Sequence, residues 1–216
     1  MPTWRRAATG LVLGCLLGMS AVAAHSAPKT VLVLGDSLSA EYGLARGTGW
    51  VNLLQQRLKA QKNDAVVVNA SISGDTTSGG KSRLPALLAA QRPAIVIIEL
   101  GANDALRGLQ LSDTKTNLLA LVGMAQKAHA RVLLVGMQIP PNYGPAYTRQ
   151  FTAVFPAVAS QTKSALAPFL LEGIADKPEL FQADRLHPLA QAHPAMLNNV
   201  WPSLLPLLNA SRLHQS

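Results

Sequence analysis

The sequence predicts an α/β fold in which helices cover both faces of a parallel sheet. Short apolar runs rich in β-branched residues alternate with longer stretches of helical period, the pattern of strands joined by crossover helices. These runs lack the apolar–polar alternation of a strand with one wet face, as expected where both faces are buried. The expected strands are Thr30–Leu34, Ala65–Asn69, Ala94–Leu100, Arg131–Met137 and Pro168–Leu171.

Apolar residues that recur on one helical face mark three crossover helices between these strands. They are Trp50, Leu54 and Leu58 in the first helix, Leu84, Leu87 and Leu88 in the second, and Leu118, Leu121, Val122 and Ala125 in the third. A fourth helix is expected over Tyr147–Ser164. A last one is expected from Pro194, where proline suits a first helical turn.

The length and the N-terminal residues predict one exported domain. The 216 residues, 49% of them apolar, can bury a single core. Residues 1–24 carry two arginines, an apolar run and then small residues, which is typical of a secretory signal peptide cut between residues 23 and 27. The apolar run is shorter than the roughly 20 residues of a membrane-spanning helix. We therefore expect a periplasmic or secreted protein without integral membrane contact, with its domain over residues 28–210 and a tail over 211–216.

The charge of the chain disfavours a nucleic-acid partner. The net charge is +8, and subtracting Arg5 and Arg6 of the signal leaves +6, scattered along the sequence. Binding to a phosphate backbone needs clustered positive charge, which the sequence lacks. A basic surface still allows weak contact with anionic lipid. The only cysteine, Cys15, lies in the signal, so we expect a mature chain without disulfides or a free thiol. We also expect a monomer.

Polar residues follow three of the expected strands, where ligands of a doubly wound sheet bind. Gly35-Asp36-Ser37 follows the first strand, Gly74 lies in the loop after the second, and Asn103 follows the third. Ser37 could act as a nucleophile. The backbone amides near Ser37 and Gly74 and the side chain of Asn103 could stabilise an oxyanion. Each segment alone could equally be a polar turn.

Asp184 and His187 lie three residues apart in one loop. One turn can hold a carboxylate against Nδ1–H of the imidazole and leave Nε2 free to accept a proton from a serine hydroxyl. His193 is the rival base, but it has no acid near it in the sequence.

Other classes of function fit less well. Gly79-Gly80-Lys81-Ser82 imitates the end of a P-loop, but Asp75 stands where that motif needs glycine. Ser39 replaces the second glycine of the nucleophile elbow of α/β-hydrolases. No His-Glu-x-x-His pattern suggests a metal hydrolase. A flavodoxin-like binding module or signalling receiver that uses Asp36 remains the non-enzyme alternative.

Four blocks in one order resemble the SGNH, or GDSL, hydrolases. They are Gly-Asp-Ser-Leu at 35–38, Gly74, Gly-x-Asn-Asp at 101–104 and Asp-x-x-His-Pro at 184–188. Longer segments are similar to the bacterial periplasmic thioesterase, lysophospholipase and arylesterase branch: residues 33–40, 68–76, 83–88 and 141–144.

The resemblance implies a flavodoxin-like three-layer α/β/α fold with five parallel strands in the order 2-1-3-4-5 and no metal or cofactor. It implies a triad of Ser37, His187 and Asp184, and an oxyanion hole of Ser37 N–H, Gly74 N–H and the Asn103 side chain. The expected function is a serine esterase that cleaves acyl esters and thioesters through an acyl-enzyme, with carbohydrate acetylesterase or acyltransferase as alternatives. Glu41, Arg185 and Leu186 depart from the family pattern and bear on the substrate range.

The acyl group needs an apolar groove beside the nucleophile. Leu38, Ile139 and Tyr143 are the expected wall residues, with Asn142 as a polar neighbour. Such a groove predicts a preference for medium or long acyl chains.

Overall fold

The computed structural model describes Met1 and residues 29–210, so the expected signal peptide and the tail lie outside the described residues. Five parallel strands form one sheet in the order β2-β1-β3-β4-β5, which confirms the predicted topology. The strands are β1 (Thr30–Gly35), β2 (Val66–Asn69), β3 (Ile95–Glu99), β4 (Arg131–Val135) and β5 (Ala165–Ala167).

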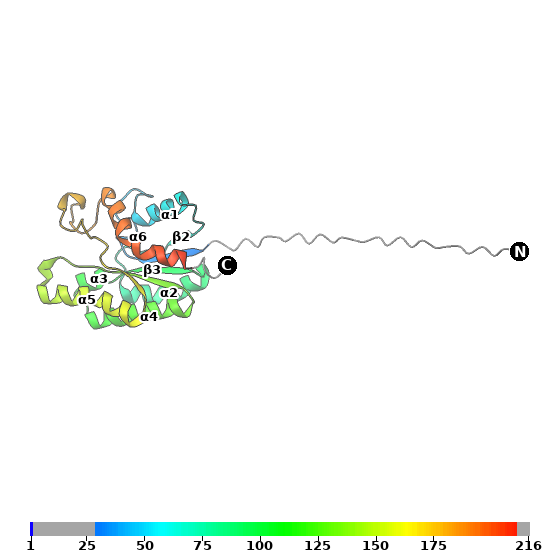
Figure 1. Ribbon diagram of the computed structural model, residues 1–216. Coiled ribbons are helices and arrows are strands. Elements are labelled where there is room, and N and C mark those ends of the chain that lie inside the picture. The colour runs from blue at the N-terminus through cyan, green and yellow to red at the C-terminus, as the bar shows by residue number, and fades with distance from the viewer. Residues whose placement is uncertain (2–28, 211–216) are drawn as a thin grey trace.

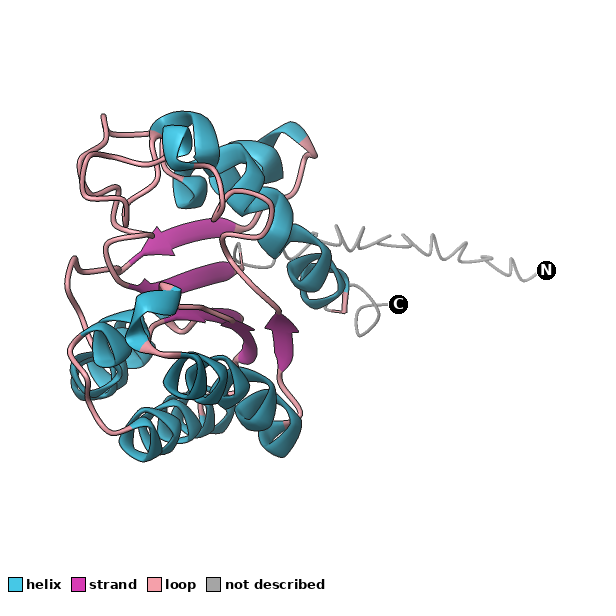
Figure 2. Cartoon of the chain, turned by 90° about the vertical axis from the view of Figure 1, so that its left-hand side faces the viewer, coloured by secondary structure: helices cyan, strands magenta, loops and turns pink. Residues whose placement is uncertain are grey.

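Two layers of helices enclose the sheet (Figures 1 and 2). On one face lie α1 (Trp50–Ala60) and α6 (His193–Asn209), which contact each other. On the other face lie α2 (Thr77–Gln91), α4 (Leu111–Lys127) and α5 (Pro145–Thr162), together with the short α3 (Ala102–Leu106). Three 3₁₀ turns complete the described chain: η1 (Pro141–Tyr143), η2 (Pro178–Leu180) and η3 (Ala190–Ala192).

The core lies between the sheet and both helical layers. Strands β1, β3 and β4 are buried along almost their whole length, as their mainly apolar sequences without alternation predict. The two edge strands differ: β5 is only partly covered, and in β2 Val66 is 44% exposed. The predicted apolar faces of α1 and α4 are buried in full, whereas in α2 Leu84 and Leu88 are buried and Leu87 is only partly covered.

The fifth strand was predicted in the wrong place. It runs over Ala165–Ala167, ahead of the expected Pro168–Leu171. Gly136 N–H donates to Ala167 O at 2.8 Å, and Leu170 N–H already donates back to Gly136 O at 3.0 Å. Pro168 has no N–H to give to a strand ladder, and the chain bends away there. Among the described residues, none of the helices has the length and apolar character to cross a membrane.

Candidate active site

Ser37 lies in a turn at the carboxyl end of β1. Ser39 N–H and Ala40 N–H donate to Asp36 O at 3.2 and 2.9 Å, and Leu38 N–H donates to Asp36 Oδ1 at 3.0 Å. These bonds fix the backbone around Ser37, whose own N–H has no acceptor within the described part of the chain. The turn therefore presents both a hydroxyl and a free backbone donor.

No helix follows Ser37 directly, and α1 begins only at Trp50. Glu41, Gly43 and Gly47 all have positive φ, which a right-handed helix does not allow. The Glu41 carboxylate accepts hydrogen bonds from Gly47 N–H and Gly49 N–H, at 2.7 to 3.1 Å. This side chain therefore closes the loop that separates the Ser37 turn from α1.

Asp184, His187 and Ser37 form one chain of hydrogen bonds. Asp184 Oδ2 lies 2.6 Å from His187 Nδ1, and His187 Nε2 lies 2.9 Å from Ser37 Oγ. Asp184 Oδ1 also accepts from the backbone N–H groups of Leu186 and His187, at 2.9 and 3.0 Å. Two loops that are 150 residues apart in the sequence thus meet at one point.

The surroundings of Asp184 keep its side chain ionised. Partial burial alone would raise the pKa of this carboxyl, but the hydrogen bonds from Leu186 N–H and from the ring and backbone of His187 outweigh it and hold the pKa at about 2. A carboxylate can only accept, so Nδ1 of His187 carries the proton and Nε2 is left as an acceptor toward the serine hydroxyl. The ring of Tyr42, which sequence reasoning missed, lies against that of His187 with 4.4 Å between centroids.

Asn103 and Gly74 occupy the neighbouring loops. Asn103 Nδ2 donates to Asp36 Oδ2 at 3.0 Å and to Asp75 O at 2.9 Å, and the residue lines the same cavity as Ser37. Gly74 has a φ of 77°, a conformation that glycine adopts without strain. Gly74 N–H has no acceptor among the described residues, and Gly74 is not part of the cavity lining.

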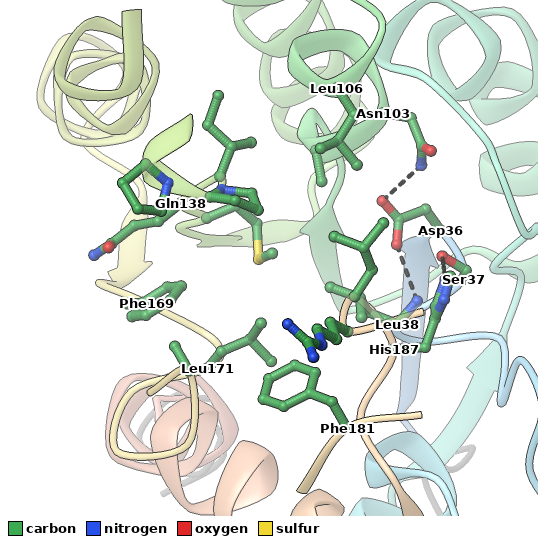
Figure 3. A pocket seen from close by; sticks show the side chains of 18 residues that line it. Asp36, Ser37, Leu38, Asn103, Leu106, Gln138, Phe169, Leu171, Phe181 and His187 are labelled. Atoms are coloured by element: carbon green, nitrogen blue, oxygen red, sulfur yellow. Dashed lines mark hydrogen bonds between the residues drawn. The ribbon is translucent and has the colours of Figure 1, made fainter. Parts of the chain in front are cut away.

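A cavity of about 400 Å³ opens beside Ser37 and His187. Leu38 and Ile139, both expected, line it. The expected Asn142 and Tyr143 lie outside it, since the chain turns away through η1 and Tyr143 is 39% exposed. Figure 3 shows Gln138, Phe169, Leu171 and Phe181 across the open space from Ser37 and His187. Sequence reasoning missed these lining residues: Ala102, Leu106, Met137, Gln138, Pro140, Pro141, Phe169, Leu171, Ala175 and Phe181. Arg185 and Leu186, which the sequence marks for the substrate range, also line the cavity.

The sequence of the domain matches that of a known protein family. Residues 33–195 match the sequence pattern of the GDSL-like Lipase/Acylhydrolase family. The chain belongs to this family. The match spans every block on which the resemblance was based, from the turn after β1 to the loop that carries His187.

Several known proteins are similar to the chain over most of its length. Esterase TesA of Pseudomonas aeruginosa is 51% identical over 198 residues, which cover 92% of this chain and 98% of the relative. Thioesterase 1/protease 1/lysophospholipase L1 of Escherichia coli strain K12 is 40% identical over 184 residues, 85% of this chain and 87% of the relative. A crystal structure of TesA superimposes with a TM-score of 0.81 at 53% identity, covering 83% of this chain and 99% of the other.

The rival base has a different place within this GDSL-like fold. His193 is buried at the start of α6, and its Nδ1 accepts a hydrogen bond from Trp50 N–H at 3.0 Å. Burial lowers the pKa of this imidazole, so the ring stays neutral and caps the first turn of α1. Among the residues that the structure describes, no cluster of three or more His, Cys, Asp or Glu side chains could hold a metal ion.

Arg185 lies inside the turn between Asp184 and His187. Its φ is 56°, in the left-handed region, and its N–H donates to Gln182 O at 2.9 Å. Four of the six non-glycine residues with positive φ directly follow a helix or its cap, whereas Glu41 and Arg185 lie in the loops beside the site. Backbone strain of this kind concentrates at functional sites. Arg185 is the one arginine or lysine in the cavity lining.

Proposed function

We propose that the chain is a serine esterase that hydrolyses acyl esters and thioesters through an acyl-enzyme on Ser37. The hydrogen-bond chain from Asp184 through His187 to Ser37 carries this proposal. The names of the relatives support it, because one is an esterase and another a thioesterase and lysophospholipase.

Each of the three hydrogen-bonded residues has its own role in the proposed reaction. Ser37 Oγ attacks the acyl carbonyl carbon while His187 Nε2 takes the hydroxyl proton, and the same imidazolium then gives that proton to the departing alcohol or thiol. Water repeats the two steps on the acyl-enzyme and releases the acid. Asp184 keeps Nδ1 protonated and stabilises the imidazolium, and its pKa of about 2 leaves it ionised throughout.

Charge that develops on the carbonyl oxygen needs donors near Ser37. Ser37 N–H and Gly74 N–H have no acceptors among the described residues and are available for this purpose. Both amide hydrogens of Asn103 point to acceptors on Asp36 and Asp75, so Asn103 joins the oxyanion hole by sharing one of them when substrate binds. Apo geometry of this kind commonly tightens only in the complex.

The cavity supplies the acyl site. Its walls are mainly apolar side chains, among them Leu38, Ile139, Phe169 and Phe181. Each methylene that leaves water for such walls contributes about 0.8 kcal/mol. Rates should therefore rise with acyl length until the cavity is filled.

A substrate panel tests the proposal. Purified mature protein, its Ser37→Ala variant and a buffer control are assayed on p-nitrophenyl esters from acetate to palmitate, on acyl-CoA thioesters and on a lysophospholipid. We expect hydrolysis of esters and thioesters that disappears in the variant. Products acylated on an added alcohol or sugar would point to acyltransfer, and activity confined to acetylated sugars would point to a carbohydrate acetylesterase. Equal rates for wild type and Ser37→Ala would refute the assignment of the nucleophile.

Location and assembly form part of the proposal. The signal-like residues 1–24 support export to the periplasm, and the scattered positive charge supports at most weak contact with anionic lipid. N-terminal sequencing of the exported protein and its elution volume in gel filtration test the cleavage between residues 23 and 27 and the monomeric state.

A further inference from the structure

A fully buried glutamate lies directly beneath the Ser37 turn. Glu99, the last residue of β3, pairs with Gly35 at the end of β1, and it is 0% exposed. Its Oε2 accepts hydrogen bonds from Ser39 Oγ at 2.6 Å and from Asp36 N–H at 3.3 Å. Its Oε1 has no hydrogen-bond partner within the described chain. A buried, ionised oxygen without a donor is costly, and this disfavours the charged form of Glu99.

A second buried carboxyl stands next to Glu99. Asp36 is 1% exposed and accepts from Leu38 N–H on Oδ1 and from Asn103 Nδ2 on Oδ2 (Figure 3). Burial raises the pKa of Asp36 to about 6, against the hydrogen bond from Leu38 and the nearby His187, while Asp75 adds to the rise. Burial raises the pKa of Glu99 further above its usual range, and the negative charge of Asp36 adds to that effect. The charge of Asp36 raises the pKa of Glu99, whereas the Glu99 side chain lowers that of Asp36, so Glu99 is the carboxyl of the pair that keeps its proton longer as the pH rises.

Hydrogen bonds connect Glu99 both to the backbone around Ser37 and to the side-chain amide of Asn103. Trp50 Nε1 donates to Ser39 Oγ at 3.2 Å, and Ser39 Oγ donates to Glu99. Asp36 N–H donates to the same Glu99 oxygen, and the Asp36 side chain holds the Asn103 amide. The residues on either side of Ser37 are thus tied to one buried side chain.

We propose that Glu99, as a neutral carboxylic acid, is a positioning residue that sets the Ser37 turn and, through Asp36, the amide of Asn103. The inference rests on the proposed function of the site, but Glu99 makes no contact with the substrate and takes part in no bond change. Because Glu99 keeps its proton, only one negative charge, that of Asp36, lies buried under the Ser37 turn.

The close fit of Gly35 supports this role. A β-carbon on Gly35 would lie 2.8 Å from Ser39 Oγ and 2.9 Å from Glu99 Oε2. The backbone of β1 therefore rests directly on the carboxyl of Glu99, and a small shift of that group displaces the turn that carries Ser37.

Two variants at one position test the proposal. Glu99→Gln keeps a neutral side chain with one acceptor and one donor, whereas Glu99→Leu keeps the approximate volume and removes both. At neutral pH we expect kcat of Glu99→Gln within about threefold of wild type and kcat of Glu99→Leu lowered by roughly 10- to 100-fold, with KM little changed in both, because misplacement of reacting groups by about 1 Å costs that much. Thermal unfolding verifies that each variant is folded at the assay temperature.

The pH profile separates positioning from a purely structural role. In wild type, kcat should fall on the alkaline side as Glu99 loses its proton beside the ionised Asp36, with Asp75 and His187 nearby. Glu99→Gln should lack this fall, because an amide has no such proton. A kcat of Glu99→Leu equal to wild type would overturn the proposal, and so would a Glu99→Gln variant as impaired as Glu99→Leu.

An infrared spectrum separates this inference from the proposed function. At neutral pH, wild type should show the carbonyl stretch of a buried protonated carboxylic acid, and Glu99→Gln should lose it. Absence of this band in wild type would refute the neutral state of Glu99. A wild type that has the band but hydrolyses no ester or thioester would instead refute the proposed function.

Discussion

Replacement of Gly35 by alanine should destabilise the protein, although the change adds a single methyl group. The added carbon would meet Ser39 Cβ and Oγ at 2.8 Å and Glu99 Oε2 at 2.9 Å, well inside the usual 3.5–4.0 Å between non-bonded carbons. Both neighbours are buried and joined by a hydrogen bond of 2.6 Å, so neither can move without weakening it. Overpacking of this kind costs about 1–3 kcal/mol of unfolding free energy. For a domain of this size that lowers Tm by roughly 2–12 °C.

Gly123→Ala provides the matched control. Gly123 lies on the exposed face in the interior of α4, and a β-carbon there would have no neighbour within 4 Å. Alanine favours a helix over glycine by about 0.5–1 kcal/mol, so the same substitution should stabilise the protein at this position. Thermal and denaturant unfolding followed by circular dichroism measure both variants.

The two glycine substitutions should change Tm in opposite directions. Gly35→Ala with the stability of wild type would mean that the strand-end packing described for Glu99 and Ser39 is wrong. A loss in both variants would mean that any added methyl group is harmful, and the argument from local space would fail.

Three further predictions concern the proposed catalytic groups. Asp184→Asn should lower kcat by roughly 10³- to 10⁴-fold, because an amide no longer holds Nδ1 of His187 protonated, and unchanged kinetics would remove Asp184 from the triad. Asn103→Ala should lower kcat by roughly 10²- to 10³-fold, as with other oxyanion donors, and a normal kcat would exclude it from that role. Glu99→Gln should become more stable relative to wild type as the pH rises above the usual 4.5 of a glutamate. The raised pKa of Glu99 means that its contribution to stability is complete at low pH and is lost as the pH rises through the folded-state value, at up to about 1.4 kcal/mol per pH unit. Chemical unfolding at pH 5 and pH 8 measures this difference, and a constant gap between the two proteins would contradict the shift.

The fold could be predicted from local pattern because buried parallel strands leave a clear sequence signal. The runs that became β1, β3 and β4 are mainly apolar, and the stretches between them carry a helical period. The fifth strand has only three residues and is partly covered, so it gives almost no such signal. The apolar segment Pro168–Leu171 has a stronger strand signal, so the sequence predicts the fifth strand there instead.

Because the fifth strand was misplaced, part of the cavity wall was not predicted. Phe169 and Leu171 lie beyond the end of β5, and both line the cavity. Because the sequence predicted them to be inside a strand, it did not predict this role. Asn142 and Tyr143 were chosen because they follow β4, but η1 turns the chain away after Pro141. The shape of a pocket depends on loop paths, which residue type alone does not determine.

The polar residues of the site were visible in the sequence, but their hydrogen-bond partners were not. Ser37, Asp184, His187 and Asn103 stand out because each follows a strand or lies in a loop of turn-forming residues. Glu99 lies inside the apolar run 94–100, where its charge was the only signal. Only the register of β1 with β3 places it beside Gly35 and beneath the Ser37 turn.

Covalent labelling of Ser37 tests the central claim most directly. The folded wild-type protein is treated with a fluorophosphonate, and the modified peptide is identified by mass spectrometry. We predict one adduct per chain, on Ser37, that forms much more slowly in His187→Ala and is absent in Ser37→Ala. A folded protein that remains unmodified, or that reacts at another serine, would contradict the account of Ser37 as a nucleophile activated by His187.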